Sequence, residues 1–77
     1  MAYEAKGREE VVDVIELSQF SELRITEIHD EDDALTGVDI RQWYCTRNDA
    51  TMKPSKGVRI RVDDLDRVID VLSAIKG

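Results

Sequence analysis

The chain has 77 residues, a formal net charge of −6 and one cysteine. This length fits one small domain, and a lone Cys45 excludes both an internal disulfide and a zinc site built from cysteines. No apolar run approaches the roughly 20 residues that a membrane-spanning helix needs, and no signal-peptide pattern opens the chain. We therefore expect one intracellular domain over residues 9–77, without a membrane segment, after a flexible tail at residues 1–8.

The first half of the chain predicts two β-strands. Residues 11–17 (VVDVIEL) are rich in β-branched side chains and favour a strand, although Val11, Val14 and Ile15 also fit the spacing of a short helix. A turn is expected at residues 18–21. Residues 23–28 (LRITEI) predict the second strand, which leads into an acidic connection, HDEDD.

A third strand is predicted over residues 35–45, with Val38 and Ile40 on one face and Asp39, Arg41 and Trp43 on the other. A polar turn follows at residues 46–50. The segment MKPSKG at residues 52–57 is expected to be a connection that concentrates positive charge. It leads into the most regular alternation of apolar and charged residues in the chain.

The fourth strand is predicted over residues 56–62. Its apolar side chains, Val58, Ile60 and Val62, point one way, and Arg59 and Arg61 point the other way. This alternation predicts a sheet with one apolar and one polar face. The predicted core therefore lies on the apolar face.

The last segment predicts a helix that starts at Asp63 as the N-terminal cap and ends near Gly77. Its apolar side chains repeat at helical spacing and form a stripe: Leu65, Val68, Ile69, Leu72 and Ile75. The predicted class is α+β, a four-stranded curved antiparallel sheet followed by a C-terminal helix that covers one face. A chain of this size buries only about 60% of its unfolded surface. The stripe is therefore also the predicted homodimer interface, and whether it packs on its own sheet or on a second subunit stays open.

Charge is unevenly distributed along the chain. Residues 9–33 carry ten acids against one base, Arg24, whereas residues 38–61 carry six bases against two acids. Since local potential decides whether a polyanion binds, a positive stripe can act on an acidic protein. The alternative is a solvated face whose charges pair within the molecule.

The sequence has few features of an enzyme. It has no phosphate-binding glycine loop, no paired-cysteine motif and no HExxH motif. His29 with Asp30, Asp32 and Asp33 would at best hold a divalent ion weakly, and a solvated connection is the simpler interpretation. We therefore expect no catalysis, no cofactor and no metal.

Two stretches carry a resemblance to a known family. VDIRQWY at residues 38–44, followed by a polar turn and MKPSKGVRI at residues 52–60, resembles the core of the positive cofactor four family. These proteins are transcriptional coactivators and their prokaryotic relatives, and they bind single-stranded DNA. The similarity covers roughly residues 22–75 and is specific over 38–60, where the D-I-R, M-K-P and K-G elements occur in the family's order.

The resemblance implies a homodimer whose helices pair and whose sheets bind single-stranded DNA. Arg41, Lys53 and Lys56 match the family's basic contacts. Tyr44 matches its stacking aromatic on the third strand and Trp43 lies one place earlier, so which of them stacks is open. The family's second strand usually ends with another stacking aromatic, where this chain has Ile28 and His29.

Strand alternation adds Arg59 and Arg61 to the predicted nucleic-acid surface. The resemblance also implies a compact prokaryotic or viral type of protein, located in the cytoplasm with the nucleoid or in the nucleus of a eukaryote, with the transcription machinery as a further partner. Two functions follow: a homodimeric single-stranded-DNA-binding coactivator-like regulator, or a protein-interaction module of the same fold with weak or lost nucleic-acid binding. Acids interleaved among the basic side chains would favour the second.

Overall fold

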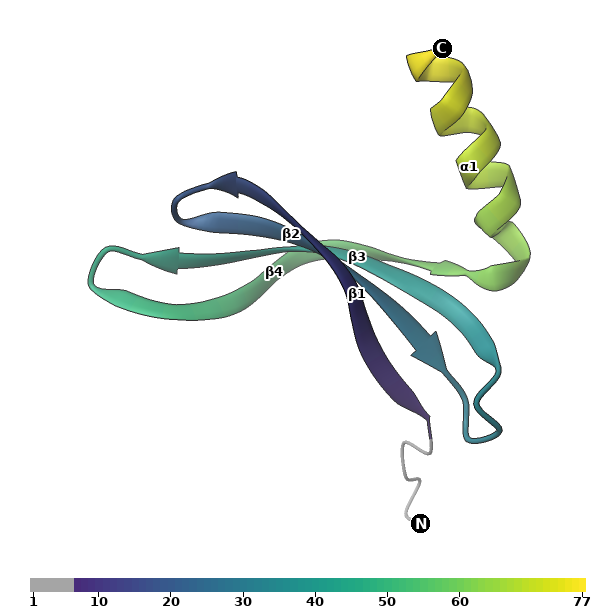
Figure 1. Ribbon diagram of the computed structural model, residues 1–77, viewed down its shortest axis with the longest axis horizontal. Coiled ribbons are helices and arrows are strands. Elements are labelled where there is room, and N and C mark those ends of the chain that lie inside the picture. Colours follow the sequence, from purple (N-terminus) through teal and green to yellow (C-terminus); the bar gives the residue numbers. More distant parts are fainter. Residues whose placement is uncertain (1–6) are drawn as a thin grey trace.

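A computed structural model describes residues 7–77 of the chain. Four strands are followed by one helix (Figure 1): β1 (Arg8–Ser18), β2 (Ser21–His29), β3 (Leu35–Thr46), β4 (Asp49–Arg61) and α1 (Val62–Lys76). The strands form one antiparallel sheet in the order β1-β2-β3-β4. The predicted α+β class and order of elements are therefore confirmed. Residues 1–6, most of the predicted tail, lie outside the described residues, and β1 already begins at Arg8.

Strand pairing divides the sheet into two faces, because residues directly opposite each other in an antiparallel pair point to the same side. One side, which we call the arginine face, holds Arg24, Arg41, Arg59 and Arg61. The other side, which we call the apolar face, holds Ile15, Leu23, Ile25, Val38, Ile40, Val58 and Ile60. The predicted faces of the third strand are thus confirmed.

A β-bulge explains why the first strand also fits helical spacing. The pairing of β1 with β2 shifts between Val11 and Asp13, so Val12 is an extra residue in β1. Such a residue resets the alternation. Val11 and Val14 therefore lie on the arginine face, opposite Thr26 and Arg24, although they are three residues apart.

β4 begins seven residues earlier than predicted, so the prediction that MKPSKG is a connection is wrong. Pro54 lies within β4 and pairs with Trp43. β4 is an edge strand, and an edge strand tolerates a proline whose missing N–H would have faced solvent. Val62 was predicted to extend this strand but is the first residue of α1.

The predicted cap of the helix is also wrong. Arg61 is the N-cap residue, with extended backbone angles and no side-chain capping bond, because β4 runs into α1 without a loop. Asp63 and Asp64 lie in the first turn instead. There their negative charges favour the positive end of the helix dipole.

The prediction that α1 covers its own sheet fails as well. The helix leaves the end of β4 and projects away from the sheet (Figure 1), and within the described residues none of its side chains is buried. Leu65 and Val68 are half-buried, whereas Ile69, Leu72 and Ile75 are 50%, 57% and 76% exposed. The radius of gyration is 14.8 Å, against about 11.5 Å expected for a compact chain of this length.

Val38 is the one apolar side chain of residues 7–77 that is buried. The other side chains of the apolar face are half-buried or exposed, and Val58 is 53% exposed on it. No helix in the described part of the chain is long and apolar enough to cross a membrane.

Candidate nucleic-acid interface

The connections at the two ends of the sheet differ in their charged residues. The β3–β4 turn and the β1–β2 turn lie at one end of the sheet (Figure 1), and the Cys45 amide donates a 2.8 Å hydrogen bond to the Phe20 carbonyl there. We call this the basic end, since it carries Arg47 and Lys53, whereas Lys56 lies farther along β4, opposite Gln42. The β2–β3 connection lies at the opposite end with residues 30–33, which we call the acidic end.

An exposed aromatic side chain lies at the basic end. Tyr44 on β3 is 41% exposed and is the cross-strand neighbour of Lys53 on β4. Lys53 lies 3.5 Å from the carboxylate of Asp49 in the turn. Hydrogen bonds from Thr51 lower the pKa of Asp49, so the carboxylate stays charged beside this lysine. Tyr44 and Lys53 therefore form an aromatic and cationic pair on one surface.

Lys56 lies in an irregular part of β4. The register shifts between Arg41 and Trp43, so that Ser55 and Lys56 together oppose Gln42. Lys56 is exposed, and the ion pairs found within residues 7–77 do not include it. The bulge thus adds an exposed cation to the middle of β4, opposite Gln42 and two residues along β3 from Tyr44.

Trp43 lies on the arginine face, the side of the sheet opposite to Tyr44. The guanidinium carbon of Arg24 lies 4.0 Å from the centroid of the Trp43 ring. A cation at this distance is attracted to the negative face of the ring. One face of Trp43 is therefore already covered, whereas Tyr44 is exposed. The structure favours Tyr44 as the aromatic available for stacking.

Arg41 is held by an acid on its own strand. Its guanidinium donates hydrogen bonds of 3.1 and 2.9 Å to the two carboxylate oxygens of Asp39, and a further one of 2.9 Å to the Ser55 carbonyl. The side chain of Asp39 is only 10% exposed. The hydrogen bonds with Asp39 raise the pKa of Arg41. Asp39 therefore fixes Arg41 in place and offsets its charge.

The remaining arginines of this face are paired in the same way. Arg24 pairs with Glu22, and Arg61 donates to Asp64 of α1 at 3.0 Å. Arg59 lies 3.6 Å from Glu9 and 3.7 Å from Asp39. Acids are thus interleaved with the bases, so the arginine face is not the uniformly positive groove that alternation of Arg59 and Arg61 suggested.

The structure therefore divides the predicted site residues between two surfaces. Four of the predicted residues lie on the arginine face: Arg41, Trp43, Arg59 and Arg61. Tyr44 and Lys53 lie on the apolar face at the basic end, and Lys56 lies in the bulge of β4 opposite Gln42. Sequence reasoning missed Arg24, which lies on the preceding strand and meets Trp43 only through the register of β2 and β3. It also missed Arg47, because that residue lies in the turn outside the matched motifs.

Gly57 has a steric role beneath Arg41. The two residues are cross-strand partners. A Cβ atom at Gly57 would lie 2.7 Å from the Arg41 Cβ, 2.8 Å from its Cγ and 2.8 Å from the Ile40 carbonyl oxygen. The strands can adopt this spacing only because residue 57 has no side chain.

We expect Gly57→Ala to lower the free energy of unfolding by about 1–3 kcal/mol, because the added methyl group forces backbone or Arg41 to move. Urea denaturation followed by circular dichroism measures this. Ser55→Ala is the control, since Ser55 is exposed and only its backbone carbonyl bonds Arg41. An unchanged urea midpoint for Gly57→Ala would mean that the close contact does not exist in solution.

His29 has neighbours that differ from those expected of the acidic loop. Its Nε2 lies 2.8 Å from the Glu27 carboxylate, and its Nδ1 lies 3.4 Å from the Asp33 carbonyl oxygen. Asp30 instead accepts backbone hydrogen bonds from Asp32 and Ala34 and so organises the turn.

Comparison with known proteins found no matching family model, no matching curated protein and no matching solved structure.

Proposed function

We propose that the chain is a homodimeric module that binds single-stranded nucleic acid, with a role in transcription or DNA maintenance. The observation that carries this proposal is the basic end, where an exposed tyrosine pairs across strands with Lys53, while Lys56 follows farther along β4. Single-strand binders combine aromatic platforms with cationic grooves, because every base has a π-face and every nucleotide has a charge.

In this proposal, Tyr44 stacks on a base while Lys53 and Lys56 contact phosphates. Arg47, in the turn, extends the cationic surface beyond the sheet. Arg41 has a secondary role, because its guanidinium already bonds Asp39 and Ser55. Three of the cations already have a carboxylate partner, so each contacts a phosphate only where the phosphate displaces that partner: Lys53, Arg59 and Arg61.

A titration with labelled single-stranded DNA tests the proposal. Fluorescence anisotropy with an oligothymidine of about 20 nucleotides should show binding at low salt that weakens steeply as salt rises, since bound phosphates release counterions. A duplex of equal length should bind less tightly, because its bases are already stacked. The absence of binding at low salt would overturn the proposal.

A second candidate is a protein-interaction module without nucleic-acid binding. The observation that favours it is the interleaving of Glu9, Glu22 and Asp39 with the arginines, which leaves that face with little net positive potential. This candidate replaces the first if the titration fails while the protein remains folded by circular dichroism.

A further inference from the structure

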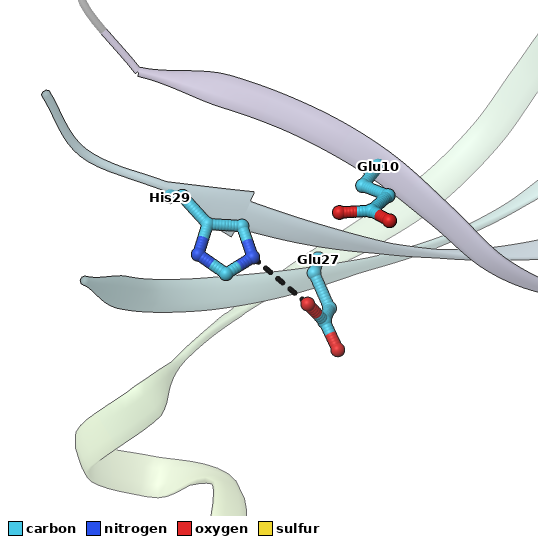
Figure 2. A group of neighbouring side chains, drawn as sticks. All are labelled: Glu10, Glu27 and His29. Carbon is cyan, nitrogen blue, oxygen red and sulfur yellow. Dashed lines mark hydrogen bonds and ion pairs between the residues drawn. The ribbon is translucent and has the colours of Figure 1, made fainter. Parts of the chain in front are cut away.

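Three side chains capable of binding a metal meet at the acidic end of the sheet. Figure 2 shows Glu10 on β1 with Glu27 and His29 on β2. One ligand atom from each residue lies within 4.8 Å of the other two. We propose that Glu10, Glu27 and His29 form a site for a divalent transition-metal ion that joins the edge strand β1 to β2.

The backbone brings these three residues together. Glu10 and Glu27 are direct cross-strand partners, and Arg8 is the partner of His29. Glu27 and His29 are two residues apart on the same strand, so their side chains point to the same face. The cluster is therefore fixed by the register of two strands rather than by the conformation of a loop.

Two carboxylates directly opposite each other repel. Glu10 and Glu27 have this arrangement, and the cation that pairs with Glu10 is Arg8, which also contacts Asp33 at 2.6 Å. If Glu10 turns toward a metal ion, Arg8 keeps its contact with Asp33. The loss of the Arg8–Glu10 ion pair therefore does not leave Arg8 without an acidic partner.

The imidazole is oriented as a ligand. The side chain of His29 is only 12% exposed, and its Nδ1 faces the Asp33 carbonyl oxygen at 3.4 Å. Metal-binding histidines generally donate their second ring N–H to such an acceptor. In that tautomer Nε2 presents a lone pair to Glu27 Oε1 at 2.8 Å. Two acceptors at this distance need a proton or a metal ion to bridge them.

The distances suit a metal after a small adjustment. Zinc bonds of about 2.0–2.2 Å to nitrogen and oxygen place neighbouring ligand atoms about 3–3.5 Å apart. The His29–Glu27 pair is already close to this spacing, and the side chain of Glu10, which is 57% exposed, can rotate to complete it. An imidazole among carboxylates selects a transition metal over magnesium and calcium, which prefer oxygen ligands.

The proposed ion would stabilise the least supported strand of the sheet. β1 is an edge strand, and every residue in it is exposed. Small domains with little core often use a metal to hold elements together. The site lies at the end of the sheet opposite to Tyr44, so it does not depend on nucleic-acid binding.

Zinc ion is the probe for this site, with the full chain free of affinity tags and Cys45→Ser as the background to exclude the thiol. The chain has one histidine, so imidazole signals in a ¹H–¹⁵N spectrum belong to His29 and are distinct from the indole signal of Trp43. We expect saturation at one zinc ion per chain by calorimetry, a shift of the His29 Nε2 signal and a higher urea midpoint with zinc. Magnesium should reproduce none of these.

Each of three substitutions should weaken zinc binding by more than about tenfold: His29→Gln, Glu10→Gln and Glu27→Gln. The loss of even a hydrogen-bond partner of a metal ligand typically lowers metal affinity by about 10–100-fold. Glu16→Gln is the matched control, because Glu16 and Glu22 are also cross-strand glutamates but have no histidine beside them. The proposal is wrong if zinc does not saturate a site, if the His29 ring signal stays unchanged, or if Glu16→Gln weakens binding as much as the three ligand variants do.

Discussion

Leu72→Asp should convert the proposed dimer to a monomer, or unfold the protein. Leu72 lies in the apolar stripe of α1 and is 57% exposed in the single chain. Burying a leucine contributes about 1.5–3 kcal/mol, and a twofold interface uses each residue twice. The dissociation constant of the dimer should therefore rise by about 10²- to 10⁴-fold. Sedimentation equilibrium measures this directly.

The exposed area of the single chain supports this expectation. Its accessible surface is 6036 Å², about 1,200 Å² more than the typical value for a folded monomer of this mass. A stable interface buries about 800 Å² per partner. The exposed apolar stripe of α1, with Ile69, Leu72 and Ile75, offers part of such an area to a second copy of this chain, and an interface there leaves Tyr44 and Lys53 at the basic end uncovered.

Ser73→Asp is the matched control for Leu72→Asp. It adds the same charge one residue later, outside the apolar stripe, and should leave the dimer intact. Ile69→Asp, within the stripe, should act as Leu72→Asp does. A wild-type protein that sediments as a fully stable monomer would contradict the proposed dimer.

Single-strand binding should respond differently to the loss of cations and to the loss of the aromatic. Replacing Lys53 and Lys56 by alanine should weaken binding to all sequences alike. It should also make the salt dependence shallower, by about 0.7 per lost phosphate contact. Tyr44→Ala should cost about 1–3 kcal/mol of binding free energy, because a base loses its stacking partner, while the salt dependence stays nearly constant. Anisotropy titrations at several salt concentrations separate these two effects.

The structure makes a further distinction between the neighbouring aromatics. Trp43→Ala should weaken binding less than Tyr44→Ala, because Arg24 already covers one face of the Trp43 ring. An equal or larger loss of affinity for Trp43→Ala would place the bound nucleic acid on the arginine face instead. The comparison therefore reports which side of the sheet the nucleic acid contacts.

A matched double variant controls for net charge. Arg67 and Lys76 lie on α1, away from the basic end, and their replacement by alanine removes the same two charges. If that variant weakens binding as much as the Lys53 and Lys56 variant, only overall charge matters and the proposed contacts are wrong. If replacing Lys53 and Lys56 leaves the salt dependence unchanged, these two lysines do not contact phosphates.

Local sequence pattern determined much of the fold. Residues alternate along a strand with a period of two, so the alternation alone predicted the faces of Val38, Asp39, Ile40 and Arg41 correctly. The helix was recognisable from its stripe of apolar residues at helical spacing. These features depend on neighbours a few residues away, and that is why the order of elements was predicted correctly.

The boundaries were harder, because they depend on contacts with other strands. Pro54 and Gly57 are typical of a connection, yet both lie in β4. Pro54 is accepted because β4 is at an edge, and Gly57 is required because Arg41 lies across from it. The position of these residues in the sheet, which local sequence pattern does not encode, decides that they belong to β4.

Composition and motif spacing alone determined the excess of acids before residue 34 and the basic MKPSKG segment. Only the tertiary structure decided that α1 stands away from its own sheet, that Arg24 covers Trp43 and that Glu10 meets His29. The physical reason is that side-chain chemistry is local, whereas pairing and burial depend on the register of strands far apart in the chain. A bulge of one residue at Val12 is enough to change which of these groups meet.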